Sequence, residues 1–297
     1  MLAIIIPYYK ITFFDETLKS LSNQTNRNFK VYIGDDFSPE NPSELLKKYE
    51  NKIDFIYQKF DNNFGRSSLT KQWERCIKLN KNEKWLMLLG DDDVLSENFV
   101  ETFYNKRLFF EELYDVVRFS VIKIDSKTNP ISNKIQNIEI ESSKNILFNT
   151  MRSSLSEYVF KTSTVNKIGF KNFPLAWWSD VLAVLEFSNF NDIYSINNSY
   201  VKVRISELSI SGSSNFEQQK EKSSYLFYNY LLLNKKKYFT YYEIDFLLER
   251  ISKRYLNNRS NIKLFYKISA TYFKNGKFIA YFKFLNRIIK SIFYKCE

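Results

Sequence analysis

Histidine is absent from this sequence of 297 residues, and cysteine occurs only twice, at Cys76 and Cys296. The absence of histidine excludes Ser–His and Cys–His nucleophilic catalysis and imidazole ligation of a metal. Acid–base chemistry must therefore come from carboxylates, tyrosines, lysines or groups of the substrate. Two isolated cysteines argue against a disulfide scaffold and against a thiolate metal site.

Long hydrophobic runs are missing as well. No segment approaches the roughly 18 consecutive apolar residues that a membrane-spanning helix needs. The N-terminal segment Met1–Pro7 is too short and uncharged for a signal peptide. We therefore expect a protein that is made and kept in the cytoplasm. Apolar residues still make up 44% of the chain, which is enough to build a folded core and excludes a disordered protein.

Positive charge is distributed unevenly along the chain. Residues 1–233 carry no net charge, whereas residues 234–297 hold 15 Lys and Arg against 4 Asp and Glu and account for the entire net charge of +11. This asymmetry predicts a boundary between two parts of the chain. From about Phe216 onward, the spacing of apolar residues predicts only helices.

The basic C-terminal helices are also rich in Phe and Tyr. Helices of this composition commonly lie on anionic membrane surfaces, so residues 234–297 are predicted to hold the protein at the inner face of the cell membrane. The alternative is a helical bundle whose aromatic faces are buried against the main domain and whose lysines are simply solvated. Nucleic acid is not an expected partner, because no recognised motif accompanies the charge.

Apolar runs that indicate strands alternate with segments of helical spacing over the first 125 residues. Such βαβ alternation predicts an α/β protein with a largely parallel sheet. The predicted strands are Leu2–Ile6, Phe29–Gly34, Asp54–Gln58, Trp85–Leu89 and Val116–Ile124. The predicted helices are Phe14–Leu21, a short one opened by Pro42, Ser67–Leu79 and Phe99–Leu113. Further along we expect a helix at Asp180–Phe187 and two edge strands, Ile193–Ile196 and Tyr200–Ile205.

Three consecutive carboxylates, Asp91, Asp92 and Asp93, follow the apolar run Trp85–Leu89. Adjacent carboxylates repel one another, and a hard divalent cation relieves that repulsion because it takes oxygen ligands and bridges to phosphate oxygens. Ligands of α/β sheets bind at the carboxyl ends of strands, where this triplet is expected. The alternative is a solvated acidic turn before a helix, with Asp93 or Ser96 as its N-cap.

Four motifs, in order, resemble glycosyltransferase family 2, the inverting nucleotide-sugar enzymes with a GT-A fold. The motifs are Ile4-Ile5-Ile6-Pro7-Tyr8-Tyr9 with Leu18–Thr25 after it, Val31–Ser38, Asn63-Phe64-Gly65 before a helix, and Leu89-Gly90-Asp91-Asp92-Asp93. Together they cover residues 1–95, and weaker matches extend to about residue 213. The resemblance implies a Rossmann-like, mainly parallel mixed sheet flanked by helices. It also implies a nucleotide-sugar domain at 1–213, with an all-helical basic extension at 214–297.

The resemblance implies roles for the residues that would bind the donor. Pro7 and Tyr8 would end the first strand at the nucleotide, with the Tyr8 ring stacked on the base. Asp36 would accept the imide N–H of uracil or a related base. The alternative for the pair Asp35-Asp36 is a cap of the turn that Ser38 and the following proline suggest.

The acidic triplet receives its roles from the same resemblance. Asp91 would reach the ribose, and Asp92 would bind Mn²⁺ or Mg²⁺ bridging the diphosphate, while Asp93 would share either task. The family often shows Asp-x-Asp-Asp, and here Gly90 replaces the first Asp. That departure keeps the metal carboxylates and puts the ribose contact in question.

Two further segments supply candidate cations for the diphosphate. In the loop that begins with Asn63, Gly65 allows a tight turn, and Arg66 or Lys71 would face the phosphates; an ordinary loop beside a solvated helix face is the alternative. Arg204 resembles a late basic position of the family, where a preorganised cation would pin the departing diphosphate. An edge-strand Arg in a surface salt bridge is the competing interpretation.

An inverting transferase needs a general base that deprotonates the acceptor hydroxyl. The family places an Asp of a Glu-Asp pair at the start of a helix, and Asp180 is the matching residue, with Ser179 in place of the acidic neighbour. Trp177 and Trp178 would form a platform for the acceptor sugar. The alternatives are an N-cap role for Asp180 and a core position for the two Trp rings.

The sequence thus predicts a metal-dependent inverting glycosyltransferase that moves a sugar from a UDP-linked donor to a glycan or lipid-linked glycan in surface polysaccharide synthesis. Two rivals stay open. A sugar-phosphate nucleotidyltransferase would carry a Gly-rich phosphate loop after the first strand, where Pro7–Thr12 contains no glycine. A non-catalytic membrane- or glycan-binding module with a degenerate nucleotide site would lack the carboxylates Asp91–Asp93.

Overall fold

The computed structural model describes residues 1–150, 154–207, 209–210, 212, 214–257 and 261–293, so Cys296 lies outside the described residues. The chain divides into two compact units. The first comprises Met1–Asn172 and Ser179–Asn215, and the second comprises Phe173–Trp178 and Phe216–Glu297. A functional division between 1–213 and 214–297 stays a prediction.

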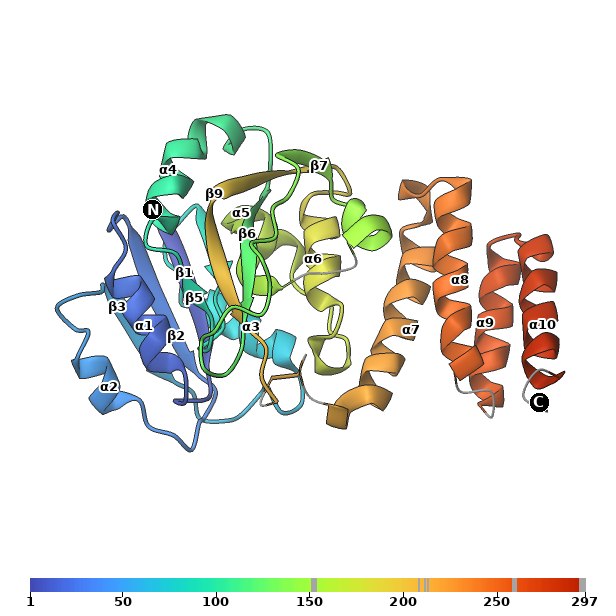
Figure 1. Cartoon of the computed structure of the whole chain (residues 1–297), viewed down its shortest axis with the longest axis horizontal. Coiled ribbons are helices and arrows are strands. Elements are labelled where there is room, and N and C mark those ends of the chain that lie inside the picture. Colours follow the sequence, from blue (N-terminus) through green and yellow to red (C-terminus); the bar gives the residue numbers. More distant parts are fainter. Residues whose placement is uncertain (151–153, 208, 211, 213, 258–260, 294–297) are drawn as a thin grey trace. The chain divides into compact units, whose positions relative to one another are not determined.

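One sheet forms the centre of the first unit, with strand order β3-β2-β1-β4-β8-β6-β9-β5, and β7 pairs with β9 (Figure 1). The strands are β1 Leu2–Tyr8, β2 Phe29–Asp35, β3 Phe55–Lys59, β4 Trp85–Leu88, β5 Val94–Leu95, β6 Val116–Ile124, β7 Ile140–Ser142, β8 Tyr158–Lys161 and β9 Asp192–Arg204. The neighbours β3, β2, β1 and β4 are mutually parallel, whereas β8 runs antiparallel to both β4 and β6. The predicted mainly parallel α/β sheet is confirmed.

Helices flank this sheet, as the βαβ pattern predicts. They are α1 Phe14–Ser22, α2 Ser43–Lys47, α3 Leu69–Ile77, α4 Phe99–Phe110, α5 Thr162–Ile168 and α6 Ser179–Phe187. α3 begins after Ser68, whose side chain accepts a hydrogen bond from the main-chain N–H of Lys71. α5 ends at Ile168 and is followed by Gly169, whose φ of 72° lies in the left-handed region that favours glycine.

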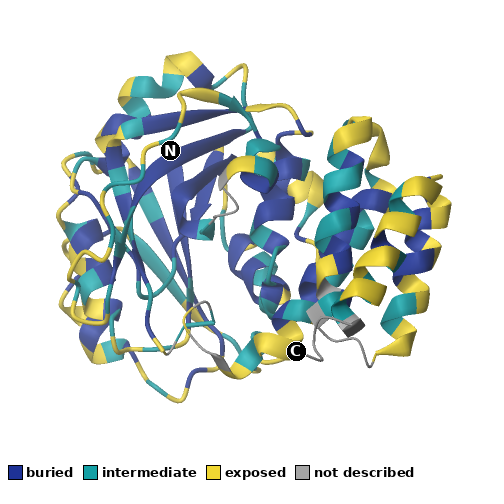
Figure 2. Cartoon of the chain, turned by 45° about the vertical axis from the view of Figure 1, so that its right-hand side comes forward, coloured by how far each residue is buried: buried dark blue, intermediate teal, exposed yellow. Residues whose placement is uncertain are grey.

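The core of the first unit lies where the central strands are covered by α1 and α4. Leu2, Ile4 and Ile6 of β1 are fully buried and belong to one cluster with Phe14 and Phe99 of the two helices. Ala3 and Ile5, on the opposite face of β1, are also fully buried. A strand buried on both faces gives a continuous apolar run rather than an alternating one. Figure 2 shows the strands of this unit as mostly buried and the exposed residues on the segments around them.

The predicted pair of edge strands is wrong in one respect. Ile193–Ile196 and Tyr200–Ile205 form the single strand β9, which has β6 on one side and β5 on the other. A register shift between Phe119 and Ser120 of β6 accommodates the extra residues of β9. Asn197 fills that irregularity, because its side-chain oxygen accepts a hydrogen bond of 2.8 Å from the Ser120 hydroxyl.

The described residues of the second unit form four long helices, as predicted for the chain beyond Phe216. They are α7 Glu217–Asn234, α8 Tyr241–Asn257, α9 Ile262–Lys274 and α10 Phe278–Phe293. Their buried side chains include Phe227, Leu231, Leu247, Leu248, Ile251, Tyr272 and Phe284. Within the described ranges, no helix combines the length and the apolar composition that crossing a bilayer requires.

Candidate active site

The predicted donor site lies at the carboxyl ends of three neighbouring parallel strands. Tyr8 ends β1 and is paired in register with Asp35 at the end of β2. β4 pairs with the other edge of β1, and the segment from Leu89 to Asp93 follows it directly. Because parallel strands bring these ends to one edge of the sheet, the Asp35-Asp36 pair and the acidic triplet belong to the same region.

Asp91 secures the loop that follows β1. One of its carboxylate oxygens accepts hydrogen bonds of 2.8 Å from the main-chain N–H groups of both Tyr9 and Lys10. Burial, followed by the charge of Asp92, raises the pKa of Asp91 to about 7. The structure therefore gives Asp91 main-chain partners, while the ribose contact that the resemblance implies stays a prediction.

Asp93 is held from two sides. One carboxylate oxygen accepts a hydrogen bond of 2.9 Å from the main-chain N–H of Arg204, and the other accepts one from the Ser156 hydroxyl. The Ser156 oxygen in turn accepts a hydrogen bond of 3.1 Å from the main-chain N–H of Gly90. Burial and the charge of Asp92 raise the pKa of Asp93 to about 7. Asp93 thus connects the acidic turn with β9 and with the 3-10 turn Leu155–Glu157.

Asp92 differs from both neighbours. Among the residues that the structure describes, none other than Asp92 itself donates a hydrogen bond to its carboxylate. Burial raises its pKa, while the positive charges of Arg204 and Lys10 lower it. A half-buried carboxylate beside two other acids and without a donor from another residue is the type of oxygen ligand that a hard divalent cation takes.

Within the described ranges, no group of three or more His, Cys, Asp or Glu side chains is arranged to hold a metal ion. Asp91 and Asp93 already accept hydrogen bonds from other described residues, so Asp92 is the member of the triplet whose carboxylate has no donor from another described residue. A single protein carboxylate is compatible with Mg²⁺, which is usually bound by one or two carboxylates together with substrate phosphates and waters.

Gly90 stands where the family pattern often has an additional Asp, and the structure gives a steric reason. A Cβ atom at Gly90 would lie 2.9 Å from an Asp92 carboxylate oxygen and 3.0 Å from one of Asp93. Any side chain at this position would therefore crowd the two carboxylates. The departure from the pattern suits the close turn that this chain forms.

Arg204 is fully buried, so the interpretation as an edge-strand Arg in a surface salt bridge is wrong. Its guanidinium donates hydrogen bonds of 3.0 Å to the Asp92 carbonyl, 2.7 Å to the Glu16 carboxylate and 2.9 Å to the Asp125 carbonyl. It also stacks on the Phe13 ring at 4.1 Å. The guanidinium that was predicted to contact the diphosphate is thus already hydrogen-bonded to acceptors of the protein.

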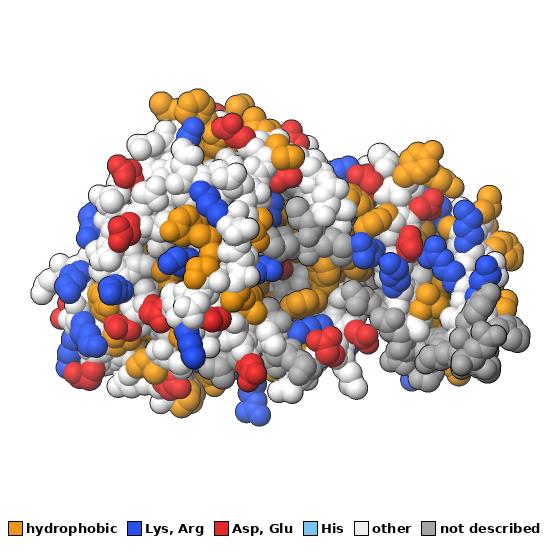
Figure 3. Space-filling view, in the orientation of Figure 1, with side chains coloured by type: hydrophobic (Ala, Val, Ile, Leu, Met, Phe, Trp, Pro, Cys, Tyr) orange, Lys and Arg blue, Asp and Glu red, His pale blue; other side chains and the backbone are white. Residues whose placement is uncertain are grey.

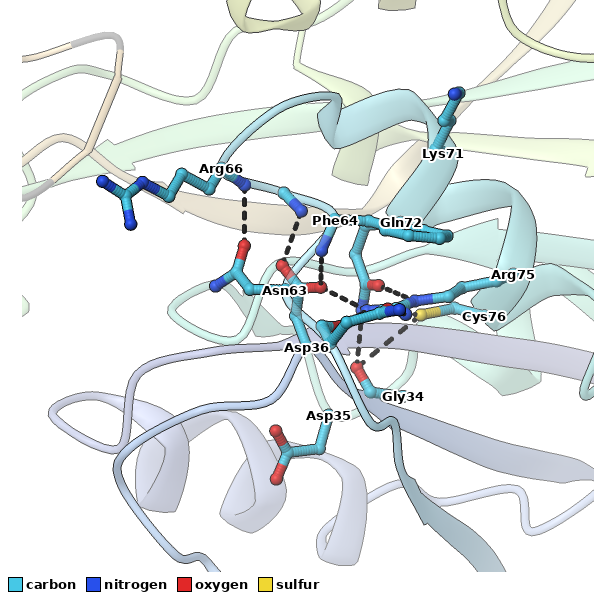
Figure 4. Close-up of polar contacts among 12 residues, drawn as sticks. Gly34, Asp35, Asp36, Asn63, Phe64, Arg66, Lys71, Gln72, Arg75 and Cys76 are labelled. Atoms are coloured by element: carbon cyan, nitrogen blue, oxygen red, sulfur yellow. Dashed lines mark hydrogen bonds and ion pairs between the residues drawn. The ribbon is translucent and has the colours of Figure 1, made fainter.

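Asp36 forms the second centre of the site (Figure 4). Its carboxylate oxygens accept hydrogen bonds of 2.7 Å from the main-chain N–H groups of Phe64 and Gly65, and Arg75 of α3 forms an ion pair with it. A Cβ atom at Gly65 would lie 2.5 Å from the carboxylate, so this close approach requires glycine. Burial raises the pKa of Asp36, against the lowering effect of the two N–H groups and Arg75.

Arg75 is a residue that sequence reasoning missed. Its guanidinium lies between the rings of Phe60 and Phe64, at 4.0 and 4.3 Å from their centroids, and donates to both the side chain and the carbonyl of Asn62. The sequence shows that Arg75 is a positively charged residue within the predicted helix 67–79. Its partner Asp36 was not, because 39 residues separate them.

Asn63, Arg66 and Lys71 take different places around Asp36. The Asn63 side-chain oxygen accepts a hydrogen bond of 2.7 Å from the main-chain N–H of Arg66 and so shapes the turn. The Arg66 and Lys71 side chains are exposed and extend away from Asp36 (Figure 4). They are the cations of this segment that stay accessible to a ligand.

Tyr8 lies inside the core, beside the half-buried Pro7. The Tyr8 ring packs against Phe14 with 4.8 Å between centroids, and its hydroxyl donates a hydrogen bond of 2.8 Å to the Glu40 carbonyl. Because the side chain is fully buried, the structure offers no exposed Tyr8 ring face on which a base would stack.

Asp180 lies in the first turn of α6, one residue after the helix begins at Ser179. It is therefore inside the helix and not its N-cap. The Ser179 hydroxyl donates a hydrogen bond of 2.7 Å to the Lys171 carbonyl, which fixes the start of this helix. Asp180 is half-buried.

Trp177 and Trp178 belong to the second unit. The Trp178 indole N–H donates a hydrogen bond of 2.8 Å to Ser224, and its ring stacks on Phe227 with centroids 4.9 Å apart. Trp178 has a φ of 73°, and Leu175 and Ala176 also have positive φ values, of 60° and 52°. Left-handed backbone conformations are uncommon at residues other than glycine, and they persist only where surrounding contacts impose them.

Comparisons with known proteins give the family of the chain. Residues 3–171 match the family model for glycosyl transferase family 2. An uncharacterized glycosyltransferase of Rickettsia bellii is 32% identical over 103 residues, a match that covers 33% of this chain and 14% of that protein. The chain therefore matches only about a seventh of this curated relative's length.

Solved structures of TarS from S. aureus share the fold. TarS 1–349 in complex with UDP-GlcNAc superposes with a TM-score of 0.64 at 19% identity, covering 88% of this chain and 74% of that one. The complex of TarS 1–349 with UDP gives a TM-score of 0.62 at 17% identity, covering 88% and 73%. The fold is thus GT-A, and because the family model matches more than half of its residues, the chain belongs to glycosyl transferase family 2.

Proposed function

We propose that this protein is an inverting glycosyltransferase that moves a sugar from a UDP-linked donor to a hydroxyl of a glycan or lipid-linked glycan in surface polysaccharide synthesis. The observation that carries the proposal is the Asp92 carboxylate. It is half-buried beside two acids, follows the end of β4, and receives no hydrogen bond from another described residue. Support for the donor comes from TarS, which has been solved with UDP and with UDP-GlcNAc.

The donor would lie across the carboxyl ends of β1, β2 and β4. Asp36 has two carboxylate oxygens with several acceptor positions, and the main-chain donors and Arg75 use only part of this capacity. We assign the remaining capacity to the imide N–H of the uracil ring. Arg66 and Lys71 are the exposed cations in the same segment, and they would approach the diphosphate.

Asp92 would hold Mn²⁺ or Mg²⁺, with the diphosphate completing the coordination. Such a cation neutralises the charge that develops on a departing nucleoside diphosphate. Asp91 and Asp93 serve this site indirectly. Asp91 fixes the loop at Tyr9 and Lys10, and Asp93 fixes the turn through Ser156 and Arg204. The Asp92 carboxylate therefore stands on a backbone that is secured on both sides.

Asp180 would accept the proton of the acceptor hydroxyl while that oxygen attacks the anomeric carbon of the donor. Single displacement from the side opposite the nucleotide gives inversion of configuration, and a carboxylate is one of the side chains that can act as the base in a chain without histidine. Trp177 and Trp178 lie three and two residues before Asp180 in the sequence. One face of the Trp178 ring packs on Phe227, and we assign the Trp pair to the acceptor sugar.

Calorimetry with UDP tests this proposal and separates it from its rivals. We expect UDP to bind in the presence of Mn²⁺, and we expect Asp92→Ala to weaken that binding strongly. Glu112→Ala, which removes an exposed carboxylate after α4, is the matched control and should leave it unchanged. Hydrolysis or transfer of the sugar from a panel of nucleotide sugars then identifies the donor.

A non-catalytic module with a degenerate nucleotide site would bind no UDP, or would bind it equally with and without the metal. A nucleotidyltransferase would release pyrophosphate from a nucleoside triphosphate and a sugar phosphate. Either result would contradict the proposed reaction.

A further inference from the structure

The last two helices carry the same exposed pattern twice. In α9 the first, fifth and twelfth residues are Ile262, Tyr266 and Phe273, and their exposed fractions are 65%, 68% and 50%. In α10 the residues at the same places are Phe278, Phe282 and Ile289, with exposed fractions of 55%, 67% and 52%. Because these places fall on one side of a helix with 3.6 residues per turn, each helix presents an exposed apolar stripe.

Lysines flank both stripes in the same way. Lys267 and Lys274 of α9 correspond in place to Lys283 and Lys290 of α10, and Lys263 adds a fifth. All five are exposed, and none has a carboxylate partner within the described part of the chain. The two helices contain no Asp or Glu at all. We define these five lysines and the two apolar stripes as the α9–α10 surface.

The two stripes meet at the turn between the helices. The ring of Phe273, in the α9 stripe, lies 5.8 Å from that of Phe278, in the α10 stripe. Figure 3 shows Lys and Arg side chains interspersed with hydrophobic ones on the visible face of the C-terminal helices. The other basic residue of α10, Arg287, pairs with Glu249, and Lys277 in the turn before α10 pairs with Asp245.

We propose that the α9–α10 surface docks on an anionic lipid bilayer. Exposed Phe, Tyr and Ile side chains beside unpaired lysines match the boundary between acyl chains and negative headgroups. A protein partner with an acidic surface would match the lysines but would leave the large exposed apolar side chains without a reason. The docking would hold the enzyme at the inner face of the membrane, where a lipid-linked acceptor would be presented.

The test measures co-sedimentation of the full chain with vesicles of phosphatidylcholine containing phosphatidylglycerol, and with vesicles of phosphatidylcholine alone. We expect binding to the anionic vesicles only, weakened by added salt. Lys267→Glu/Lys283→Glu should reduce the partition coefficient by about tenfold or more, given the attraction of each lysine to an anionic surface. Lys222→Glu/Lys253→Glu, which makes the same charge change on α7 and α8, should retain binding.

A second variant tests the apolar stripes. Tyr266→Ser/Phe282→Ser keeps every charge, and it should also lose vesicle binding while keeping its helical circular dichroism. Equal losses in the Lys222/Lys253 control and in the Lys267/Lys283 variant would overturn the proposal, as would equal binding to uncharged vesicles. The proposal would also be overturned if Tyr266→Ser/Phe282→Ser kept its vesicle binding but changed its oligomeric state. The α9–α10 surface would then join copies of this chain. Vesicle binding is measured without a sugar donor. A failure to bind vesicles would therefore contradict membrane docking and leave the proposed sugar transfer standing.

Discussion

The main-chain N–H of Arg204 donates a hydrogen bond of 2.9 Å to the Asp93 carboxylate, and the Arg204 guanidinium donates one of 3.0 Å to the carbonyl of Asp92. The end of β9 therefore determines the shape of the acidic turn after β4. Within the acidic triplet, Asp91 and Asp93 hold the backbone in place through hydrogen bonds, whereas Asp92 is the residue whose carboxylate no other described residue bonds.

Asp92→Ala and Asp93→Ala should separate function from stability. Asp92→Ala removes a carboxylate that no other described residue bonds and whose charge repels Asp91 and Asp93, so the variant should be at least as stable as the wild type. Asp93→Ala leaves the Ser156 hydroxyl and the Arg204 N–H without their acceptor, and it should cost about 2 kcal/mol or more. Urea unfolding followed by circular dichroism measures both. A similar loss in the two variants would mean that Asp92 also supports the fold.

Arg204→Met should destabilise the protein by about 2–3 kcal/mol, because it removes a buried guanidinium that donates hydrogen bonds to two carbonyls and to the partly exposed Glu16 carboxylate. The carbonyls of Asp92 and Asp125 would lose their donor, and Glu16 would lose its cation. Arg204→Lys should recover little, since an ammonium cannot replace the planar fork of donors. Lys202→Met, two residues earlier on β9, is the control and should be close to neutral. Wild-type stability in Arg204→Met would show that the buried network contributes no net energy.

Arg75→Met should destabilise the protein more at neutral than at acidic pH. Burial already raises the pKa of Asp36, and Arg75 lowers it, so the substitution raises that pKa further. A raised native pKa means that the folded protein binds the proton more tightly, and stability falls as the pH rises from the unfolded toward the folded pKa. At low pH Asp36 is protonated in both proteins and the charge effect disappears.

Chemical denaturation of wild type and Arg75→Met at pH 4 and pH 7 checks this sign. A stability difference that is independent of pH would show that Arg75 acts through its packing between Phe60 and Phe64 alone. The same variant should bind UDP more weakly, because the loop held by Asp36 loses its support.

Asp180→Asn should lower kcat for sugar transfer by about 10²–10⁴-fold, the usual contribution of a general base. Affinity for UDP should stay unchanged, because the proposed base acts on the acceptor. Asp192→Asn, an exposed carboxylate at the start of β9, is the matched control and should transfer at the wild-type rate. Full activity in Asp180→Asn would assign the base to another residue.

Much of the fold was predictable because the central strands are buried on both faces. β6 was predicted over Val116–Ile124, and the structure has the same bounds. β5 and β7 were not predicted, since strands of two and three residues leave no apolar period to recognise. Their pairing with β9 is also what converts the expected edge strands into an interior one.

The sequence by itself determined the order of strands and helices, the four motifs of the family, and the concentration of positive charge in the last part of the chain. Only the tertiary structure decided that, among the described residues, Asp91 and Asp93 have donors from other residues and Asp92 has none. It also decided that Arg204 is buried and that Tyr8 is a core residue. The physical reason is that the deciding partners are distant in sequence: 63 residues separate Ser156 from Asp93, and 188 separate Glu16 from Arg204. Hydrogen bonds across such separations form only once the sheet has brought its strand ends together.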